Sequence, residues 1–340
     1  MAARWADVID DTPERGEIIA TLSSSLETST AEVYSRHWSN FVAWCESQVN
    51  PPCALPATTG TVLRWLVSVT KGGKVRAGSL QPYLSALNRV HRDLNLEEPA
   101  LGHLIQQYRR GRAHQQTDAG RAARRVYLPP PVVEGVLLWA LALEIPADDR
   151  SKTSKRLRSA FRAAVATVFT FCFFARGGTG ALLCVKDVRR SAAGVTVTLA
   201  KEKGKKTAWD ARTITLPPGA IPGLEELLAK WEDFRGPRTA GDCYYALPSE
   251  RARPRATAID TWLREILAHL DYEPPAGELW SGHSVRKGAA SGAGSRGVSI
   301  DRICFLGGWS VHGKAVHDYI DPTCPDSAAG RRFFGWLRPA

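Results

Sequence analysis

The stretch Ser281–Ala290, SGHSVRKGAA, places a histidine and an arginine three residues apart and follows them at once with small side chains. On a helix, residues at i and i+3 share one face, with Cβ atoms about 5–6 Å apart. His283 and Arg286 are therefore predicted to present an imidazole and a guanidinium to one point. The small residues after them allow close approach of a neighbouring helix or a ligand. Taken alone, such a pair is more often a surface face that makes ion pairs.

The segment after this helix adds two further boxes. Ser299 is suited to cap a short helix that runs through Phe305, and Gly307-Gly308 is suited to end it. Trp309 follows directly, and Tyr319 lies ten residues further on. Alone, the tryptophan indicates packing and the tyrosine a core or turn aromatic.

The composition limits the kinds of partner. The chain has 340 residues, enough for two domains, and a formal net charge of +11. This charge indicates a polyanion as partner, either nucleic acid or an acidic membrane surface. The sequence contains no run of about 18 apolar residues, and its first residues, MAARWADVIDDTPERGE, are too acidic and polar for a signal peptide. We therefore expect an intracellular protein that does not enter a membrane.

Several kinds of chemistry lack their usual motifs. The seven cysteines are scattered without a C-x-x-C pair, so we expect buried free thiols and neither a zinc site nor a disulfide framework. The sequence has no Walker loop, no H-E-x-x-H and no G-x-G-x-x-G after a strand. We therefore expect no metal, no ATP and no other cofactor.

The first third of the chain is predicted to be a helical domain over residues 22–116, after a flexible N-terminus over residues 1–21. Apolar residues recur at helical spacing in four segments, at 23–48, 58–72, 78–95 and 102–116. The stretch TDAGRAARRVYLPPP, residues 117–131, is first polar, then basic, then proline-rich, which is typical of a linker, and we place the linker at residues 117–128.

Arginines gather on or beside this linker, with only Asp118 against them. They are Arg109, Arg110, Arg112, Arg121, Arg124 and Arg125. Arginine clusters often contact phosphates, so we interpret this one as DNA-binding, the alternative being a solvated hinge.

Residues 129–340 mix helices with a small antiparallel hairpin. The strands GVTVTLAK and RTITLP flank a basic turn, and apolar helical segments surround them. The expected fold is mainly α with a small antiparallel β-hairpin or sheet, an α+β class.

With these residues in view, the chain resembles the tyrosine recombinases, also called phage-type integrases. Their signature runs H-x-x-R, then a helix opening with G-V/I, then L-G-H or G-G-W, then a tyrosine about nine residues later. Here the matches are His283-Ser-Val-Arg286, Gly297-Val-Ser-Ile, Leu306-Gly-Gly-Trp309, and Tyr319 at a spacing one residue longer. The HSVRKGAA and GGW boxes are closer to eukaryotic transposon recombinases than to bacterial chromosome resolvases.

The resemblance extends upstream to FFARGGTGALLCVKDV. Arg176 stands at the family's first arginine, and Asp187, eleven residues later, stands where the pattern expects an acid. Thr179 stands where the family usually has Glu or Asp, which implies rearranged support for the arginine. Alone, Arg176 before two glycines would suit the C-terminus of a helix, where the macrodipole favours a cation.

The resemblance implies a SAM-like four-helix core-binding domain followed by a catalytic domain, and it implies roles for the residues. Arg176 and Arg286 would neutralise charge on the phosphorane, since guanidiniums form forked hydrogen bonds to phosphate. Tyr319 would be the nucleophile that holds the 3′ phosphate. His283 would take the proton. Trp309 can donate an indole N–H but cannot act as a base.

The family supplies the proton for the leaving 5′ oxygen from a lysine on a hairpin turn. Lys201 aligns best by strand register, whereas Lys203 fits the shorter hairpins of relatives, and we favour Lys201.

The resemblance also implies a partner and an assembly. The partner is double-stranded DNA, held in a C-shaped clamp, and recombination would use a homo-tetramer on paired sites, in a nucleus or nucleoid. The tail RRFFGWLRPA would dock on a neighbouring protomer or pack on its own domain. Two other functions stay open: a type IB topoisomerase, and a recombinase-derived DNA-binding protein that no longer cuts.

Overall fold

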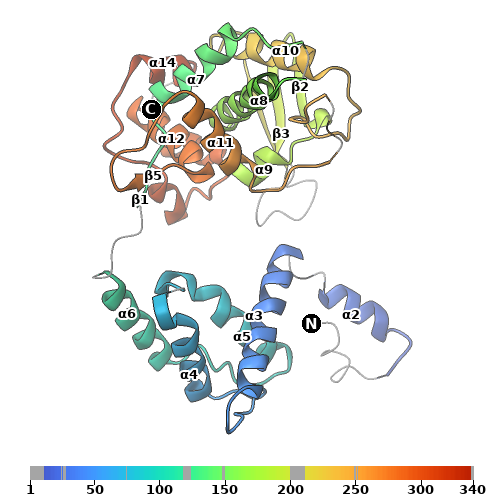
Figure 1. Cartoon of the computed structure of the whole chain (residues 1–340), viewed down its shortest axis with the longest axis vertical. Helices are drawn as coiled ribbons and strands as arrows, with labels where there is room; N and C mark the ends of the chain where they lie inside the picture. Colours follow the sequence, from blue (N-terminus) through green and yellow to red (C-terminus); the bar gives the residue numbers. More distant parts are fainter. Residues whose placement is uncertain are drawn as a thin grey trace. The chain divides into compact units, whose positions relative to one another are not determined.

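The computed structural model describes residues 11–23, 25, 28–73, 75–117, 124–147, 150–199, 211–248, 250 and 252–337. The chain divides into two compact units, Met1–Ala122 and Ala123–Ala340 (Figure 1). The division falls inside the segment 117–128 that the sequence analysis interprets as a linker.

The first unit is helical. Its helices are α2 (Arg15–Ser23), α3 (Thr28–Glu46), α4 (Thr59–Thr70), α5 (Gln81–Asp93) and α6 (His103–Thr117), with 3-10 turns η1 (Lys71–Gly73) and η2 (Ala77–Ser79). The four helices expected from spacing are α3 to α6. Helix α2 lies partly within the segment 1–21 that the sequence analysis set apart from the helical domain. Its apolar side chains Ile18 and Leu22 stay exposed, so the helix lacks the buried apolar face that a periodic pattern would mark.

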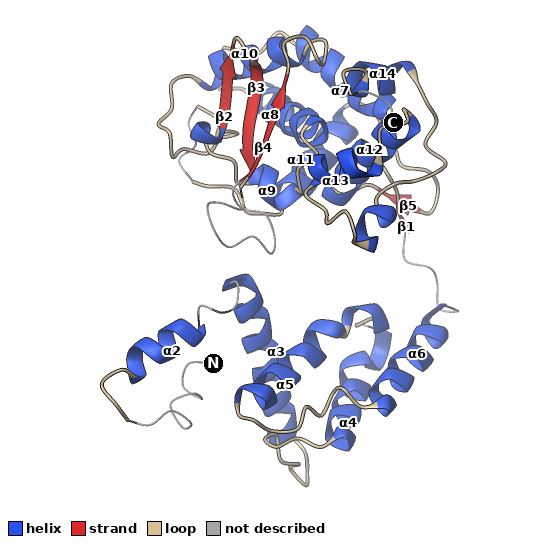
Figure 2. Ribbon diagram, turned by 180° about the vertical axis from the view of Figure 1, so that it is seen from behind, coloured by secondary structure: helices blue, strands red, loops and turns tan. Residues whose placement is uncertain are grey.

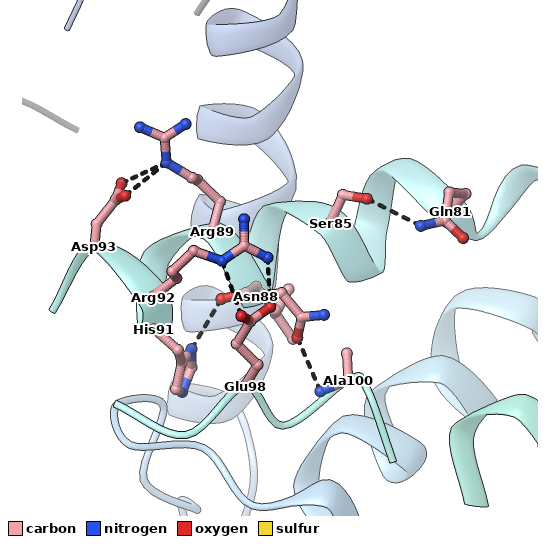
Figure 3. Close-up of polar contacts among 10 residues, drawn as sticks. Gln81, Ser85, Asn88, Arg89, His91, Arg92, Asp93, Glu98 and Ala100 are labelled. Atoms are coloured by element: carbon pink, nitrogen blue, oxygen red, sulfur yellow. Dashed lines mark hydrogen bonds and ion pairs between the residues drawn. The ribbon is translucent and has the colours of Figure 1, made fainter. Parts of the chain in front are cut away.

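Polar contacts fix α5 within this unit (Figure 3). The side-chain oxygen of Asn88 accepts the backbone N–H of Ala100 at 2.9 Å, and Arg92 holds Glu98 through two bonds of 2.7 and 2.8 Å. The buried ring of His91 accepts the N–H of Ala57 at Nε2 (2.8 Å) and meets the carbonyl of Leu87 at Nδ1 (2.9 Å). These partners match a neutral imidazole, and burial lowers the pKa of His91.

The second unit is mainly helical, with a small antiparallel sheet. Its helices are α7 (Pro130–Ala142), α8 (Lys152–Cys172), α9 (Gly177–Ala181), α10 (Leu224–Arg235), α11 (Ala258–His269), α12 (Gly282–Ser295), α13 (Ile300–Gly307) and α14 (Ala328–Phe334), with 3-10 turns η3 (Val185–Asp187) and η5 (Lys314–Asp318). Its strands are β1 (Arg124–Arg125), β2 (Val188–Ser191), β3 (Gly194–Leu199), β4 (Arg212–Leu216) and β5 (Glu278–Leu279).

The expected hairpin is β3–β4, in the register Val195 opposite Leu216. Strand β2 extends it to a three-stranded antiparallel sheet in the order β2-β3-β4 (Figure 2). The short, arginine-containing β2 carries too weak an alternation to be predicted. Strand β1 pairs in parallel with β5, so Arg124 and Arg125 belong to the second unit although the sequence placed them in the linker.

Helix α8 forms the centre of this unit, because nearly all its residues from Ala160 to Cys172 are buried. It packs against α7, α11 and α12, and both views show it inside the layer of helices (Figures 1 and 2).

The rings of Phe333 and Phe334, on α14, lie 5.1 and 5.6 Å from Phe171 of α8. Of the two alternatives for the tail, the structure therefore has the described part packed on its own domain. No helix in the described ranges is long and apolar enough to cross a membrane.

Candidate active site

Local sequence fixes where α12 begins. The hydroxyl of Ser284 accepts the N–H of Ser281 at 3.0 Å, and the carboxylate of Asp260 accepts the N–H of Gly282 at 2.6 Å. A Cβ on Gly288 would lie 2.1 Å from the carbonyl oxygen of Leu128, so the helix backbone touches a neighbouring backbone there. The small residues thus permit the close approach that the sequence predicted, and the capped first turn carries His283.

Arg286 lies buried beneath this turn, with 1% of its surface exposed. Its Nη1 donates to the carbonyl of Phe174 at 2.8 Å, and its Nη2 donates to the carbonyl of Gly307. The guanidinium carbon lies 4.0 Å from the ring centre of Trp309 and 5.5 Å from that of Tyr319. The arginine therefore joins the end of α8 to the end of α13 beneath both aromatic rings, at contact distances for a cation–π interaction.

The box after α12 folds as its capping residues predicted. The Ser299 hydroxyl accepts the N–H of Arg302, and Gly308 ends α13 with a left-handed φ of 63°. This conformation is easy for glycine. The chain then turns back and brings the rings of Trp309 and Tyr319 to a centre distance of 4.8 Å.

Tyr319 follows the 3-10 turn η5, and its backbone N–H donates to the carbonyl of Val316 at 2.9 Å. Its hydroxyl oxygen lies 3.2 Å from Nδ1 of His283, whose side chain is exposed. A hydroxyl within hydrogen-bond reach of an imidazole is the arrangement of a nucleophile and its base.

Surrounding groups lower the pKa of His283. Desolvation of the imidazole is the largest cause, followed by the positive charge of Arg125, with smaller contributions from Arg286 and Arg176. The carboxylate of Asp260 acts in the opposite direction. A lowered pKa keeps the imidazole neutral at pH 7, and a neutral imidazole can accept a proton from a hydroxyl.

The structure places Arg176 at the start of a helix. Helix α8 ends at Cys172, and Arg176 is the N-cap residue of α9, so the expectation of a helix C-terminus was wrong. A Cβ on the next residue, Gly177, would lie 3.7 Å from Cα of Gly282, which brings this step against the start of α12. Arg176 thus lies near His283. At the N-terminus of α9 the helix dipole does not favour a cation, so the dipole does not explain an arginine here.

Asp187 and Thr179 stand at the two positions where the family pattern has an acidic residue, and their surroundings differ. Asp187 caps a 3-10 turn, since its carboxylate accepts the N–H of Cys184 at 2.8 Å. Thr179 is buried within α9. A carboxylate also acts on His283, that of Asp260, which the sequence analysis did not select because it lies 23 residues upstream of His283 on another helix.

The remaining predicted residues are the two lysines and the DNA-binding arginines, and some of them fall outside the residues that the structure describes. Lys201, Lys203 and Arg121 fall outside the described residues. Arg109, Arg110 and Arg112 lie on α6 in the first unit. Among them Arg112 has a structural contact, since it donates to the carbonyl of Thr70 at 3.0 Å, whereas Arg110 is exposed. Arg125 belongs with the His283 site through its charge. In the portion of the chain that the structure describes, no group of three or more His, Cys, Asp or Glu side chains could hold a metal ion.

Known proteins are similar to this chain in sequence and in fold. No family model matches the chain. It is 25% identical to the Cre recombinase of Escherichia phage P1 over 297 residues, which are 83% of this chain and 80% of that protein. The chain is thus similar in sequence to one tyrosine recombinase and shares its fold with others.

Two solved structures show the same fold. The integrase of transposon Tn1549, solved with transposon right end DNA, superposes with a TM-score of 0.54 at 11% identity, covering 86% of this chain and 94% of that one. The site-specific recombinase XerH, solved with a palindromic difH substrate after cleavage, gives a TM-score of 0.54 at 12% identity, covering 97% and 82%.

Proposed function

We propose that this chain is a site-specific DNA recombinase or integrase that breaks and rejoins DNA through a 3′-phosphotyrosyl intermediate at Tyr319, without metal or ATP. The observation that carries the proposal is the distance of 3.2 Å between the Tyr319 hydroxyl and Nδ1 of His283, above the buried guanidinium of Arg286. A nucleophile, a base and a cation thus converge on one point.

In the proposed reaction the Tyr319 oxygen attacks the scissile phosphorus as His283 takes its proton. A bond forms from the phenolic oxygen to phosphorus, and the bond to the 5′ oxygen of the next nucleotide breaks. Arg176 and Arg286 stabilise the phosphorane, and the two carbonyls that hold Arg286 fix its plane before DNA arrives. Trp309 packs against the nucleophile and would offer an indole N–H to a phosphate oxygen.

The leaving 5′ oxygen needs a proton, which we assign to a lysine between β3 and β4. Lys201 is the first choice and Lys203 the second. Since the phosphotyrosyl bond keeps the energy of the bond it replaces, a free 5′ hydroxyl can reverse the step and rejoin the strand without ATP.

We further propose double-stranded DNA as the partner. The net charge of +11 supports this, as do the DNA complexes in which Tn1549 integrase and XerH were solved. The arginines of α6, together with Arg121, Arg124 and Arg125, would contact the phosphate backbone. A homo-tetramer on two paired sites, acting in a nucleus or nucleoid, completes the proposal.

The test is to trap the covalent intermediate. The full chain is incubated in EDTA with nicked duplexes drawn from the DNA that flanks its own gene, and SDS-resistant protein–DNA adducts are mapped by mass spectrometry. We expect an adduct at Tyr319 that Tyr319→Phe abolishes. Tyr272→Phe is the matched control, because the Tyr272 hydroxyl lies against Gly135 of α7 and has no role in the proposed reaction, and it should leave the adduct intact.

The other outcomes separate the alternatives. Tight binding of the same duplexes without an adduct would favour the DNA-binding protein that no longer cuts. An adduct together with relaxation of plasmids that carry a single site, and no recombination between two sites, would favour the topoisomerase.

A further inference from the structure

The hydroxyl of Ser291, on α12, joins this helix to the segment that carries Tyr319. Ser291 is buried, with 1% of its surface exposed. Its oxygen donates to the backbone carbonyl of Tyr319 at 3.1 Å and accepts the backbone N–H of Asp321 at 2.8 Å. One small side chain therefore holds the backbone on both sides of Ile320.

A second contact, one turn earlier on α12, holds the same segment. The ammonium of Lys287 lies 3.3 Å from the Asp321 carboxylate, which is itself 8% exposed. That carboxylate also accepts the hydroxyl of Thr323 at 2.7 Å and its N–H at 3.1 Å. Lys287 and Ser291 are spaced i and i+4, so both contacts leave one face of the helix.

This face belongs to the helix that also carries His283 and Arg286. The base, the buried cation and the two contacts to the nucleophile's segment thus lie on one rigid element. The position of the Tyr319 hydroxyl relative to Nδ1 of His283 then depends on how firmly the backbone after Tyr319 is tied to α12.

We infer that Ser291 is a positioning residue that sets the distance between the nucleophile Tyr319 and His283, an inference that rests on the proposed function. Serine suits this position because one hydroxyl can donate and accept at the same time. Here it donates to the carbonyl of Tyr319 and accepts the N–H of Asp321. Alanine would leave both backbone groups buried without this partner, and such groups shift to find another or to reach water. The tyrosine would move with them.

The experiment uses the full chain with Ser291→Ala, Ser291→Thr and, as a matched control, Ser295→Ala. Ser295 lies one turn further along α12, where its hydroxyl donates to the carbonyl of Gly292 at 3.0 Å and also hydrogen-bonds the Cys324 thiol, beyond the backbone of residues 319–321 that Ser291 holds. Three quantities are measured on the nicked duplexes that the wild type cuts: the single-turnover rate of adduct formation, its pH profile, and DNA affinity. Amide hydrogen exchange of residues 319–323 is measured without DNA.

We expect Ser291→Ala to slow adduct formation by about ten- to a hundredfold, the usual cost of a misplaced reacting group. DNA affinity and the midpoint of the pH profile should stay unchanged, because His283 and the basic contacts are intact. Exchange of the Asp321 amide should accelerate. Ser291→Thr, which keeps the hydroxyl, should restore both the rate and the protection, and Ser295→Ala should behave as wild type.

A wild-type rate in Ser291→Ala would overturn the inference while the proposed function stands. The inference would also be overturned if Ser291→Ala lost rate only in proportion to a loss of DNA affinity, or if Ser295→Ala lost as much rate. If the wild-type chain forms no adduct on duplexes that it binds, the proposed function fails and the positioning role falls with it. The exchange data then report only whether Ser291 holds the segment.

Discussion

Removal of the Arg286 side chain tests the site most directly, because this group has both a structural and a proposed chemical role. In Arg286→Ala the carbonyls of Phe174 and Gly307 lose a charged donor, and Trp309 loses its cation at 4.0 Å. A hydrogen bond to a charged group contributes about 1.5–3 kcal/mol. Two such bonds give about 3–6 kcal/mol, from which the cost of burying the guanidinium must be subtracted.

We therefore expect Arg286→Ala to lower the free energy of unfolding by about 3 kcal/mol, the lower end of that range. For a unit of this size each kcal/mol shifts the melting temperature by about 2–4 °C, so the expected shift is about 6–12 °C. Differential scanning calorimetry measures this shift. Arg286→Lys is the matched variant, since it keeps the charge but replaces a planar fork by a single ammonium, and it should melt between the two.

Cleavage should suffer far more than stability. At a temperature well below the melting transition, both variants should slow adduct formation by about a hundredfold or more, the usual cost of removing a group that stabilises charge in the transition state. DNA affinity, followed by fluorescence anisotropy, should change little because many basic contacts share it. Equal loss of cleavage and affinity in a folded variant, or cleavage near the wild-type rate, would refute the role that we assign to Arg286.

Three further predictions follow from the same structure. The rate of adduct formation should fall as pH decreases through a midpoint below the usual histidine value of 6.5, since the pKa of His283 is lowered and its neutral form is the base; this midpoint should be absent in His283→Gln. Gly288→Ala should cost at least about 2 kcal/mol in urea unfolding, because its Cβ would meet a backbone carbonyl at 2.1 Å, whereas Gly111→Ala, with open space around it, should not destabilise. Lys201→Ala should slow cleavage of an ordinary duplex but not of one with a sulfur leaving group at the cut, and the same pattern in Lys203→Ala alone would move the general acid to that residue.

Local patterns in the sequence were sufficient to predict most of the helices and their ends. Ser299 and Gly308 predicted both ends of α13, because a cap and a left-handed glycine act within one turn. The spacing of His283 and Arg286 predicted that they share a face if the segment is a helix, and both residues do lie on α12. Strand β2 was not predicted, because a short strand gains its stability from pairing with β3 and has little pattern of its own.

Parts of the site depend on contacts between distant residues, and these could not be predicted. Asp260 and Ser291 lie on different helices, and nothing local marks either one as a neighbour of the tyrosine or histidine. Taken alone, the two glycines after Arg176 suggested the end of a helix, although the backbone leaves α8 at Cys172 and starts α9 after the arginine. Arg286 was expected on a face that meets a ligand, yet it is buried and holds two carbonyls of the protein itself.

The double duty of Arg286 bears on how such a chain would change over evolution. A descendant that gave up cutting DNA would still need the guanidinium to hold the ends of α8 and α13 together, so selection for a folded protein would retain it. The Tyr319 hydroxyl bonds to the exposed imidazole of His283, and its loss would cost the fold little. Under the proposed function, the tyrosine oxygen is therefore the position whose loss would record the end of catalysis when relatives are compared, whereas survival of the arginine would record only that the protein still folds.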